Sequence, residues 1–238
     1  MSAHFRPLDL VAGYTRNEGA PYVLEMLRHS RLHFNDETRG GDVLASLGDW
    51  LQRHGVREPN EVLDFYGLRA PEFAAKSGTD VLVPLEELLG DMHVYCPVNY
   101  LVEEATALGS RVFAYEFAQL PYYRWWARWQ GVPQLLDLVY ASGLVRAIQH
   151  EYGLDHKELA FSQDMAAAFA AFVWNGEPPP ESNWTRWETF HRGSLVFVGS
   201  ENGSYAVAAS MPHERNCAFW RRFLNPLPAT TASTAVTP

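Results

Sequence analysis

The segment Arg111–Gly143 reads RVFAYEFAQLPYYRWWARWQGVPQLLDLVYASG, and the rest of the chain is interpreted from it. It opens with an apolar, aromatic run, Val112–Phe117, which is typical of a β-strand. An aromatic connection, Pro121–Trp129, follows, and a turn with a helix-like segment, Gly131–Tyr140, comes next. A long loop rich in Trp and Tyr either lies over a cleft, where loops often carry sites, or covers the edge of a core.

The composition indicates a globular protein. The 238 residues are 47% hydrophobic and 13% aromatic, which is enough apolar material for one good core or two small ones. The formal net charge of -9 disfavours nucleic acid as a partner, because phosphate binding needs a basic face. The longest apolar run, Ala166–Trp174, is far shorter than the ~20 residues that span a bilayer, so no membrane span is predicted.

The remaining periodic segments predict further elements. A strand, Leu8–Tyr14, should be followed by a helix, Pro21–Arg28, and later helices should end near Gly55 and Gly109. Asp42 should cap the first of these, and Gly90-Asp91 should break the helical run that precedes Cys96. The other expected elements are helices at Glu61–Tyr66, Pro71–Lys76, Pro84–Leu89, Ser162–Trp174 (with Met165, Phe169, Phe172 and Val173 inward) and Pro212–Leu224, and a β pair at Ser194–Gly199 and Ser204–Ala209.

The common short motifs for catalysis and metal binding are absent from the sequence. The chain has no nucleophile elbow, dinucleotide fingerprint, phosphate loop or zinc motif, and its nine His residues are scattered. We therefore expect no metal and no cofactor. Glu18 lies between a strand and a helix, where α/β sheets place their chemistry, although a carboxylate there also simply favours the helix N-terminus.

Six segments, in order, resemble the C-terminal half of the cholinesterase, or type-B carboxylesterase, family. They are Gly13–Gly19, Gly90–Pro97, Val112–Phe117, Trp129–Gly143, Phe172–Pro178 and Cys217–Trp220. The resemblance implies an α/β fold, namely the C-terminal part of an α/β-hydrolase with a mixed sheet, flanking helices and an incomplete sheet. Residues 1–225 would form this portion and residues 226–238 a disordered tail. The family's nucleophilic Ser and oxyanion glycines would lie in an absent N-terminal half. An unrelated globular protein with chance matches is the remaining alternative.

The resemblance places Glu18 on the family's triad acid and Gln134 on its triad His. A carboxamide cannot take up a proton near neutral pH, and loss of the base typically costs ~10⁴–10⁶ in rate. Leu135 stands where the family has Gly, so we expect a remodelled turn, and Asp137 should keep only a buried polar role. The implied function is an inactive cholinesterase-like module for binding, adhesion or secretion. The alternative is part of an active carboxylic-ester hydrolase whose base and N-terminal half lie elsewhere.

The resemblance also implies a disulfide, partners and a compartment. Cys96 and Cys217 fall on positions that the family joins, which implies an oxidising, secreted or lumenal location. Asn183 and Asn202 begin sequons and are glycosylation candidates. The start lacks the apolar region of a signal peptide, so we expect that Met1 is not the biological start. The expected partners are the missing half, or another chain that covers the sheet, and a second copy bound through the last helix and Glu61–Tyr66. The expected lining of a gorge is Tyr122, Tyr123, Trp125, Trp126 and Trp129.

Overall fold

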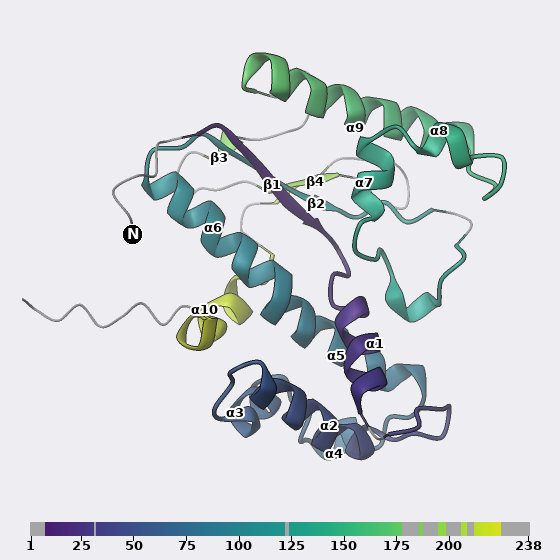
Figure 1. Ribbon diagram of the computed structural model, residues 1–238, viewed down its shortest axis with the longest axis vertical. Coiled ribbons are helices and arrows are strands. Elements are labelled where there is room, and N and C mark those ends of the chain that lie inside the picture. The colour runs from purple at the N-terminus through teal and green to yellow at the C-terminus, as the bar shows by residue number, and fades with distance from the viewer. Residues whose placement is uncertain are drawn as a thin grey trace, which may run out of the picture.

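A computed structural model gives the structure of the protein (Figure 1). It describes residues 8–30, 32–121, 124–177, 186–187, 195–198, 206–208 and 212–224, and between 186 and 208 it describes the backbone alone. The predicted disordered tail lies outside the described residues.

A mixed sheet forms one layer of the molecule. Its strands β1 (Leu10–Thr15), β2 (Val112–Phe117) and β4 (Leu195–Val198) run parallel, in the order β1-β2-β4. The strand β5 (Ala206–Ala208) pairs antiparallel with β4, and β3 (Arg186–Trp187) pairs antiparallel with the start of β2. The prediction of an α/β fold with a mixed sheet is therefore confirmed, and both the central strand and the late β pair form where they were predicted.

Helices cover both faces of this sheet (Figure 1). Val112 and Ala114 of β2 pack against α6 (Cys96–Ala107) on one face. Tyr115 and Phe117 pack on the other face, against α7 (Leu136–Ala141) and α9 (His156–Asn175). All six side chains of β2 are buried, because the strand lies between two layers of helices.

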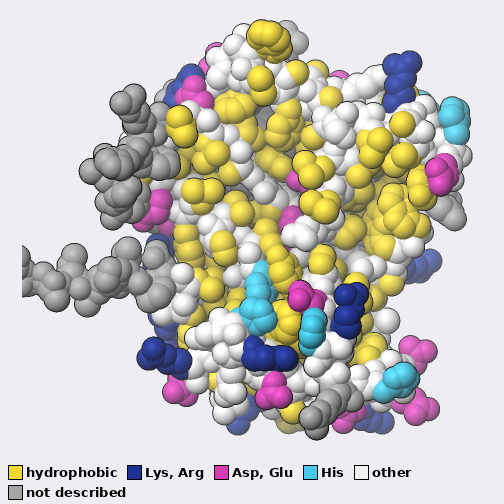
Figure 2. Space-filling model, in the orientation of Figure 1, with side chains coloured by type: hydrophobic (Ala, Val, Ile, Leu, Met, Phe, Trp, Pro, Cys, Tyr) yellow, Lys and Arg dark blue, Asp and Glu magenta, His cyan; other side chains and the backbone are white. Residues whose placement is uncertain are grey.

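A second core lies among the helices below the sheet in Figure 1. Its apolar side chains, such as Leu47, Leu85 and Trp220, are fully buried or nearly so. In Figure 2, apolar side chains cover much of the surface in the upper part of the view, where the sheet layer lies. Charged and His side chains lie mainly along the rim and over the helical layer below. The elements of this layer are α1 (Ala20–His29), α2 (Gly40–Arg53), α3 (Pro59–Phe65), α4 (Pro71–Ala74), α5 (Thr79–Gly90) and α10 (Glu214–Leu224).

The expected helix break at Gly90-Asp91 is wrong. A π-helical turn, η1 (Asp91–Tyr95), carries the chain from α5 into α6 without interruption. Gly90 has ordinary helical backbone angles, and a Cβ there would lie 2.6 Å from the ring of Tyr95. The glycine therefore makes room for a tyrosine and does not end the helix.

Three other helix predictions need correction. Asp42 is not the cap of α2 but lies three residues inside it, where its carboxylate accepts a hydrogen bond from the N–H of Arg39 (2.8 Å). The helix α9 begins at His156, because Asp155 caps it through Lys157 N and Glu158 N. Val173, predicted to face inward, is 78% exposed, since it lies about 80° around the helix from Met165.

The connections contain two further short helices, η2 (Arg128–Gln130) and α8 (Val145–Ile148). Within the described residues, no helix has the length and apolar character needed to cross a bilayer.

Candidate functional site

Glu18 lies in the turn between β1 and α1, at the carboxyl end of the parallel strands. Its side chain is 4% exposed, and Oε1 accepts hydrogen bonds from the N–H (2.6 Å) and the hydroxyl (2.9 Å) of Thr15. The backbone N–H of Glu18 donates to the hydroxyl of Tyr95 (2.8 Å), which in turn donates to the carbonyl of Arg16 (2.6 Å). The carboxylate is therefore fixed in one orientation by its own turn and by η1.

Asn17 joins this turn to the loop that carries Gln134. The backbone N–H of Asn17 donates to the carbonyl of Val132 (3.0 Å), and the N–H of Val132 donates to Oδ1 of Asn17 (2.9 Å). Asn17 and Pro133 also form a parallel β-bridge. This link brings the side chain of Gln134 close enough to the Glu18 carboxyl to lower its pKa. The structure thus brings together the two residues that the sequence placed on the triad acid and the triad His.

Burial raises the pKa of the Glu18 carboxyl above its ordinary value. The hydrogen bonds from Thr15 and Gln134 act against this increase, whereas the charge of Asp137 adds to it. Asp137 is buried and accepts a hydrogen bond from the hydroxyl of Tyr115 (2.7 Å). In this arrangement the amide of Gln134 can donate a hydrogen bond to Glu18, but no group at this position can accept a proton from a nucleophile at neutral pH.

Glu86 of α5, which is not among the predicted site residues, holds the same turn from the opposite side. Its Oε1 accepts from the N–H of Gly19 (2.9 Å) and its Oε2 from the side-chain amide of Asn17 (3.1 Å). Glu86 is 4% exposed, and burial raises its pKa to about 7. A carboxyl inside the apolar run Val81–Leu89 was the available signal, because a charge placed in such a run needs a buried partner.

The expectation of a remodelled turn stays a prediction, and the backbone at Leu135 is unusual for its residue type. Leu135 has φ 71, the left-handed conformation that glycine adopts most easily, although it is a leucine and is 60% exposed. The loop therefore has a backbone suited to glycine at this position and bears the steric cost of a side chain there.

Replacement of Leu135 by Gly should stabilise the protein by about 0.5–1 kcal/mol, because relief of left-handed strain exceeds the added chain entropy. Leu138 is a matched control, since it is 57% exposed but lies within α7. Leu138→Gly should destabilise by about 1 kcal/mol, because glycine weakens a helix. Urea unfolding of both variants tests this. A loss of stability in Leu135→Gly would contradict the left-handed conformation of Leu135.

The aromatic side chains of the loop Pro121–Trp129 pack against two different cores. Trp129 packs against the helical core, and Trp126 packs against the core beside α9 and donates from Nε1 to the carbonyl of Gly131 (2.8 Å). Trp125 is 51% exposed and lies against Tyr152, with ring centroids 4.3 Å apart. Trp126 and Trp129 therefore each cover the edge of a core, whereas the ring of Trp125 is exposed to solvent. The other two predicted lining residues, Tyr122 and Tyr123, and the sequon residues Asn183 and Asn202 lie outside the described residues.

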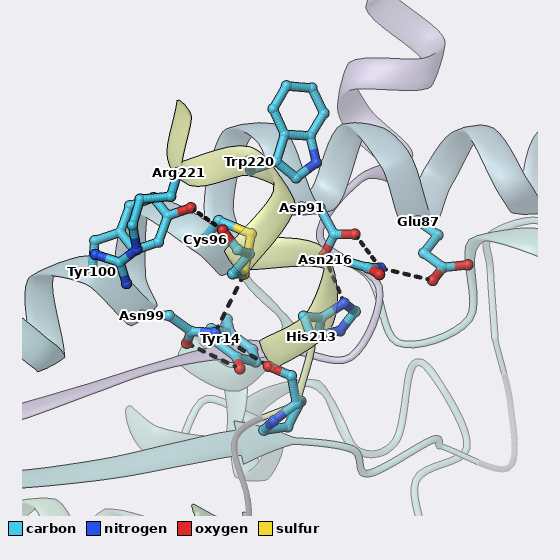
Figure 3. Close-up of a disulfide and its surroundings, with 12 residues drawn as sticks. Tyr14, Glu87, Asp91, Cys96, Asn99, Tyr100, His213, Asn216, Trp220 and Arg221 are labelled. Carbon is cyan, nitrogen blue, oxygen red and sulfur yellow. Dashed lines mark hydrogen bonds and ion pairs between the residues drawn. A yellow bond between two sulfur atoms is a disulfide. The ribbon is translucent and has the colours of Figure 1, made fainter. Parts of the chain in front are cut away.

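Cys96 and Cys217 form a disulfide that ties α6 to α10 (Figure 3). Both residues are buried, and Tyr100 beside them donates to the carbonyl of Cys217 (2.5 Å). Among the described residues, the one group of three potential metal ligands is Asp91 with these two cysteines. Because both sulfurs are committed to the disulfide, this group has no thiolate to offer a metal.

Known proteins resemble this chain in sequence over most of its length. The sequence model of the carboxylesterase family matches residues 1–220. Acetylcholinesterase of Bungarus fasciatus is 25% identical over 228 residues, which cover 94% of this chain and 36% of that protein. Acetylcholinesterase of Gallus gallus is 25% identical over 140 residues, 59% of this chain and 18% of that protein. The chain thus spans about a third of the length of the first of these relatives.

Proposed function

The chain belongs to the carboxylesterase family, and from this membership we propose that it forms a cholinesterase-like module that binds without hydrolysing esters. In this proposal residues 1–225 are the C-terminal part of an α/β-hydrolase domain with an incomplete sheet. Glu18 is the former triad acid, and Gln134 occupies the position of the triad base.

The contact between Gln134 and Glu18 carries the proposal. In a hydrolase triad the imidazole takes the proton of the nucleophile and later returns a proton, while the acid orients the imidazole and stabilises its charged form. The carboxamide of Gln134 lowers the pKa of the Glu18 carboxyl, as a hydrogen-bond donor does, but it does not titrate near neutral pH. Two features hold the Gln134 side chain in place. One is the pair of hydrogen bonds between Asn17 and Val132, which we call the Asn17–Val132 clamp. The other is the left-handed turn at Leu135. In this proposal the backbone that would position an acid–base pair is present, but Gln134 takes the place of the base.

The sheet supports a role in binding. Among the described strands, β1 pairs with β2 alone and leaves its other side as an edge. An apolar edge strand favours pairing with another strand, so we propose that a further segment of the protein or a partner chain adds to β1. A homodimer through α10 and the Glu61–Tyr66 region stays a prediction. Within this chain these two parts already pack together, with Phe65 stacked on Phe219 at 3.9 Å.

The disulfide supports an oxidising compartment, and we propose a secreted or lumenal location. Thiol titration of the protein isolated from its source, under denaturing conditions, measures this. Two free thiols per chain would contradict the proposed location.

Ester hydrolysis tests the proposed loss of activity. The protein from its natural source should hydrolyse acetylthiocholine and 4-nitrophenyl acetate at the background rate, since lack of the base typically costs ~10⁴–10⁶. Gln134→Ala should give the same background rate. Turnover well above background that survives Gln134→Ala would instead establish the alternative, an ester hydrolase with its base elsewhere. Turnover that Gln134→Ala abolishes would show that Gln134 itself acts in catalysis. Either of these results would overturn the proposal.

A further inference from the structure

The helix α10 is attached to the rest of the protein around a buried carboxylate, Asp91 of η1 (Figure 3). Asp91 has no exposed surface. Its Oδ1 lies 2.6 Å from Nδ1 of His213, and its Oδ2 accepts from the hydroxyl of Tyr66 (2.5 Å) and the amide of Asn216 (2.7 Å). Two of these three partners lie at the start of α10, since His213 directly precedes the helix and Asn216 lies in its first turn. A buried carboxylate without its partners is costly, so these contacts stabilise the docked helix.

His213 also connects α10 to the turn of Glu18. Its ring stacks on that of Tyr95, with centroids 4.0 Å apart and planes at 14°. The Tyr95 hydroxyl is the group that bridges Glu18 N–H and the Arg16 carbonyl. His213 itself has φ 63, a left-handed conformation that is unfavourable for histidine, and its carbonyl accepts from the N–H of Cys217 (2.7 Å) in the first turn of α10. The contacts of the imidazole and the disulfide at Cys217 offset this cost.

The surroundings of His213 are strongly acidic. The titratable groups that face it are Asp91 and Tyr95 from η1, Glu86 and Glu87 from α5, and Glu116 from β2. Burial lowers the pKa of His213, but the hydrogen bond and charge of Asp91, with the charges of Glu116 and Glu87, outweigh this effect. The pKa of His213 is therefore raised above its ordinary value, and the folded protein favours the imidazolium.

We propose that the ion pair of His213 and Asp91 is a pH-dependent latch that docks α10 and, through Tyr95, tightens the turn of Glu18. The disulfide keeps α10 tethered when the latch opens, so the opening is local and reversible. This inference rests on the contacts of α10 and is independent of the proposed loss of esterase activity.

The direction of the pH dependence follows from linkage. Because the folded state raises the pKa of His213, its stabilisation is fully present below the ordinary His value of about 6.5. It is lost as the pH rises through the higher folded-state pKa. Glu86 acts in the same direction, because its pKa of about 7 in the folded state makes its ionisation unfavourable as the pH rises from about 4.5. The latch is therefore closed in mildly acidic and open in mildly alkaline solution.

Hydrogen exchange measured by mass spectrometry tests the latch in the intact, oxidised protein. We compare peptides that cover residues 214–224 and 16–19 at about pH 5.5 and about pH 8.5, with rates corrected for intrinsic exchange. Both regions should open several-fold more often at the higher pH, because the ion pair of His213 and Asp91 is lost there. In His213→Gln this dependence should become clearly smaller in both regions, and the part that Glu86 contributes should remain. His150→Gln is the matched control, because His150 is exposed and lies after α8, and it should behave like the wild type.

An unchanged pH dependence of either region in His213→Gln would overturn the proposal. If this variant does not fold, an NMR titration of the His213 Cε1 proton in the wild type decides the question. Titration clearly above the ordinary value of about 6.5 supports the latch, and titration at or below that value overturns it.

Discussion

Joint replacement of Cys96 and Cys217 by Ala is expected to lower the free energy of unfolding by about 5 kcal/mol, the largest effect predicted for a change in this chain. The disulfide closes a loop with a sequence separation of 121 residues. A cross-link over so long a loop removes much of the chain entropy of the unfolded state, and its loss restores that entropy. The measurement is urea unfolding of the oxidised protein and of the double variant.

The reduced wild type is the matched control for this experiment. It lacks the cross-link but keeps both sulfur atoms, which are buried beside Asn99 and Tyr100. The reduced protein and the double variant should therefore differ by only about 1–2 kcal/mol, the packing contribution of the two side chains. If the free energies of unfolding of the double variant and of the oxidised protein differ by less than about 1 kcal/mol, the entropic account of this disulfide is wrong.

Gly19→Ala is expected to destabilise the protein by about 3 kcal/mol or more, because there is no room for a methyl group. A Cβ at Gly19 would lie 1.8 Å from the carbonyl oxygen of Glu86 and 2.7 Å from the backbone nitrogen of Gly90. Both atoms belong to the backbone of α5, so they cannot move aside as a side chain would. The backbone angles of Gly19 are ordinary (φ -77, ψ -18), and close approach of the two helices is therefore the whole reason for a glycine. The substitution should also separate Glu18 from Gln134.

Gly48→Ala is the control, since Gly48 lies inside α2 and an added Cβ would meet nothing within 4 Å. It should stabilise the protein by about 0.5–1 kcal/mol, because alanine favours helix over the unfolded chain. Urea unfolding of both variants measures the contrast. A Gly19→Ala protein as stable as the wild type would show that α1 does not pack against α5 as closely as described.

The helix α5 and the loop at Gln134 illustrate what local sequence cannot predict. Gly90 looks like a helix breaker, yet the chain continues as a helix because Tyr95 fills the space beside it. Leucine disfavours the left-handed conformation, yet Leu135 adopts it. In both places the contacts of the folded protein outweigh a propensity of about 1 kcal/mol per residue.

The sequence by itself determined the elements whose pattern is local and the family to which the chain belongs. Val112–Phe117 forms the predicted strand with the predicted bounds, because apolar side chains lie on both of its faces and the strand lies inside a sheet. The order of the family segments gave the pairing of Glu18 with Gln134 as an expectation.

Only the tertiary structure decided what holds these two residues together and what surrounds them. The clamp from Asn17 to Val132, the buried Glu86 and the pair of Asp91 with His213 each join segments that are distant in sequence. No periodicity records such contacts, because the direction of one polar side chain depends on how whole helices pack. Burial then makes each of these polar groups depend on its partner, and that dependence fixes the geometry of the site.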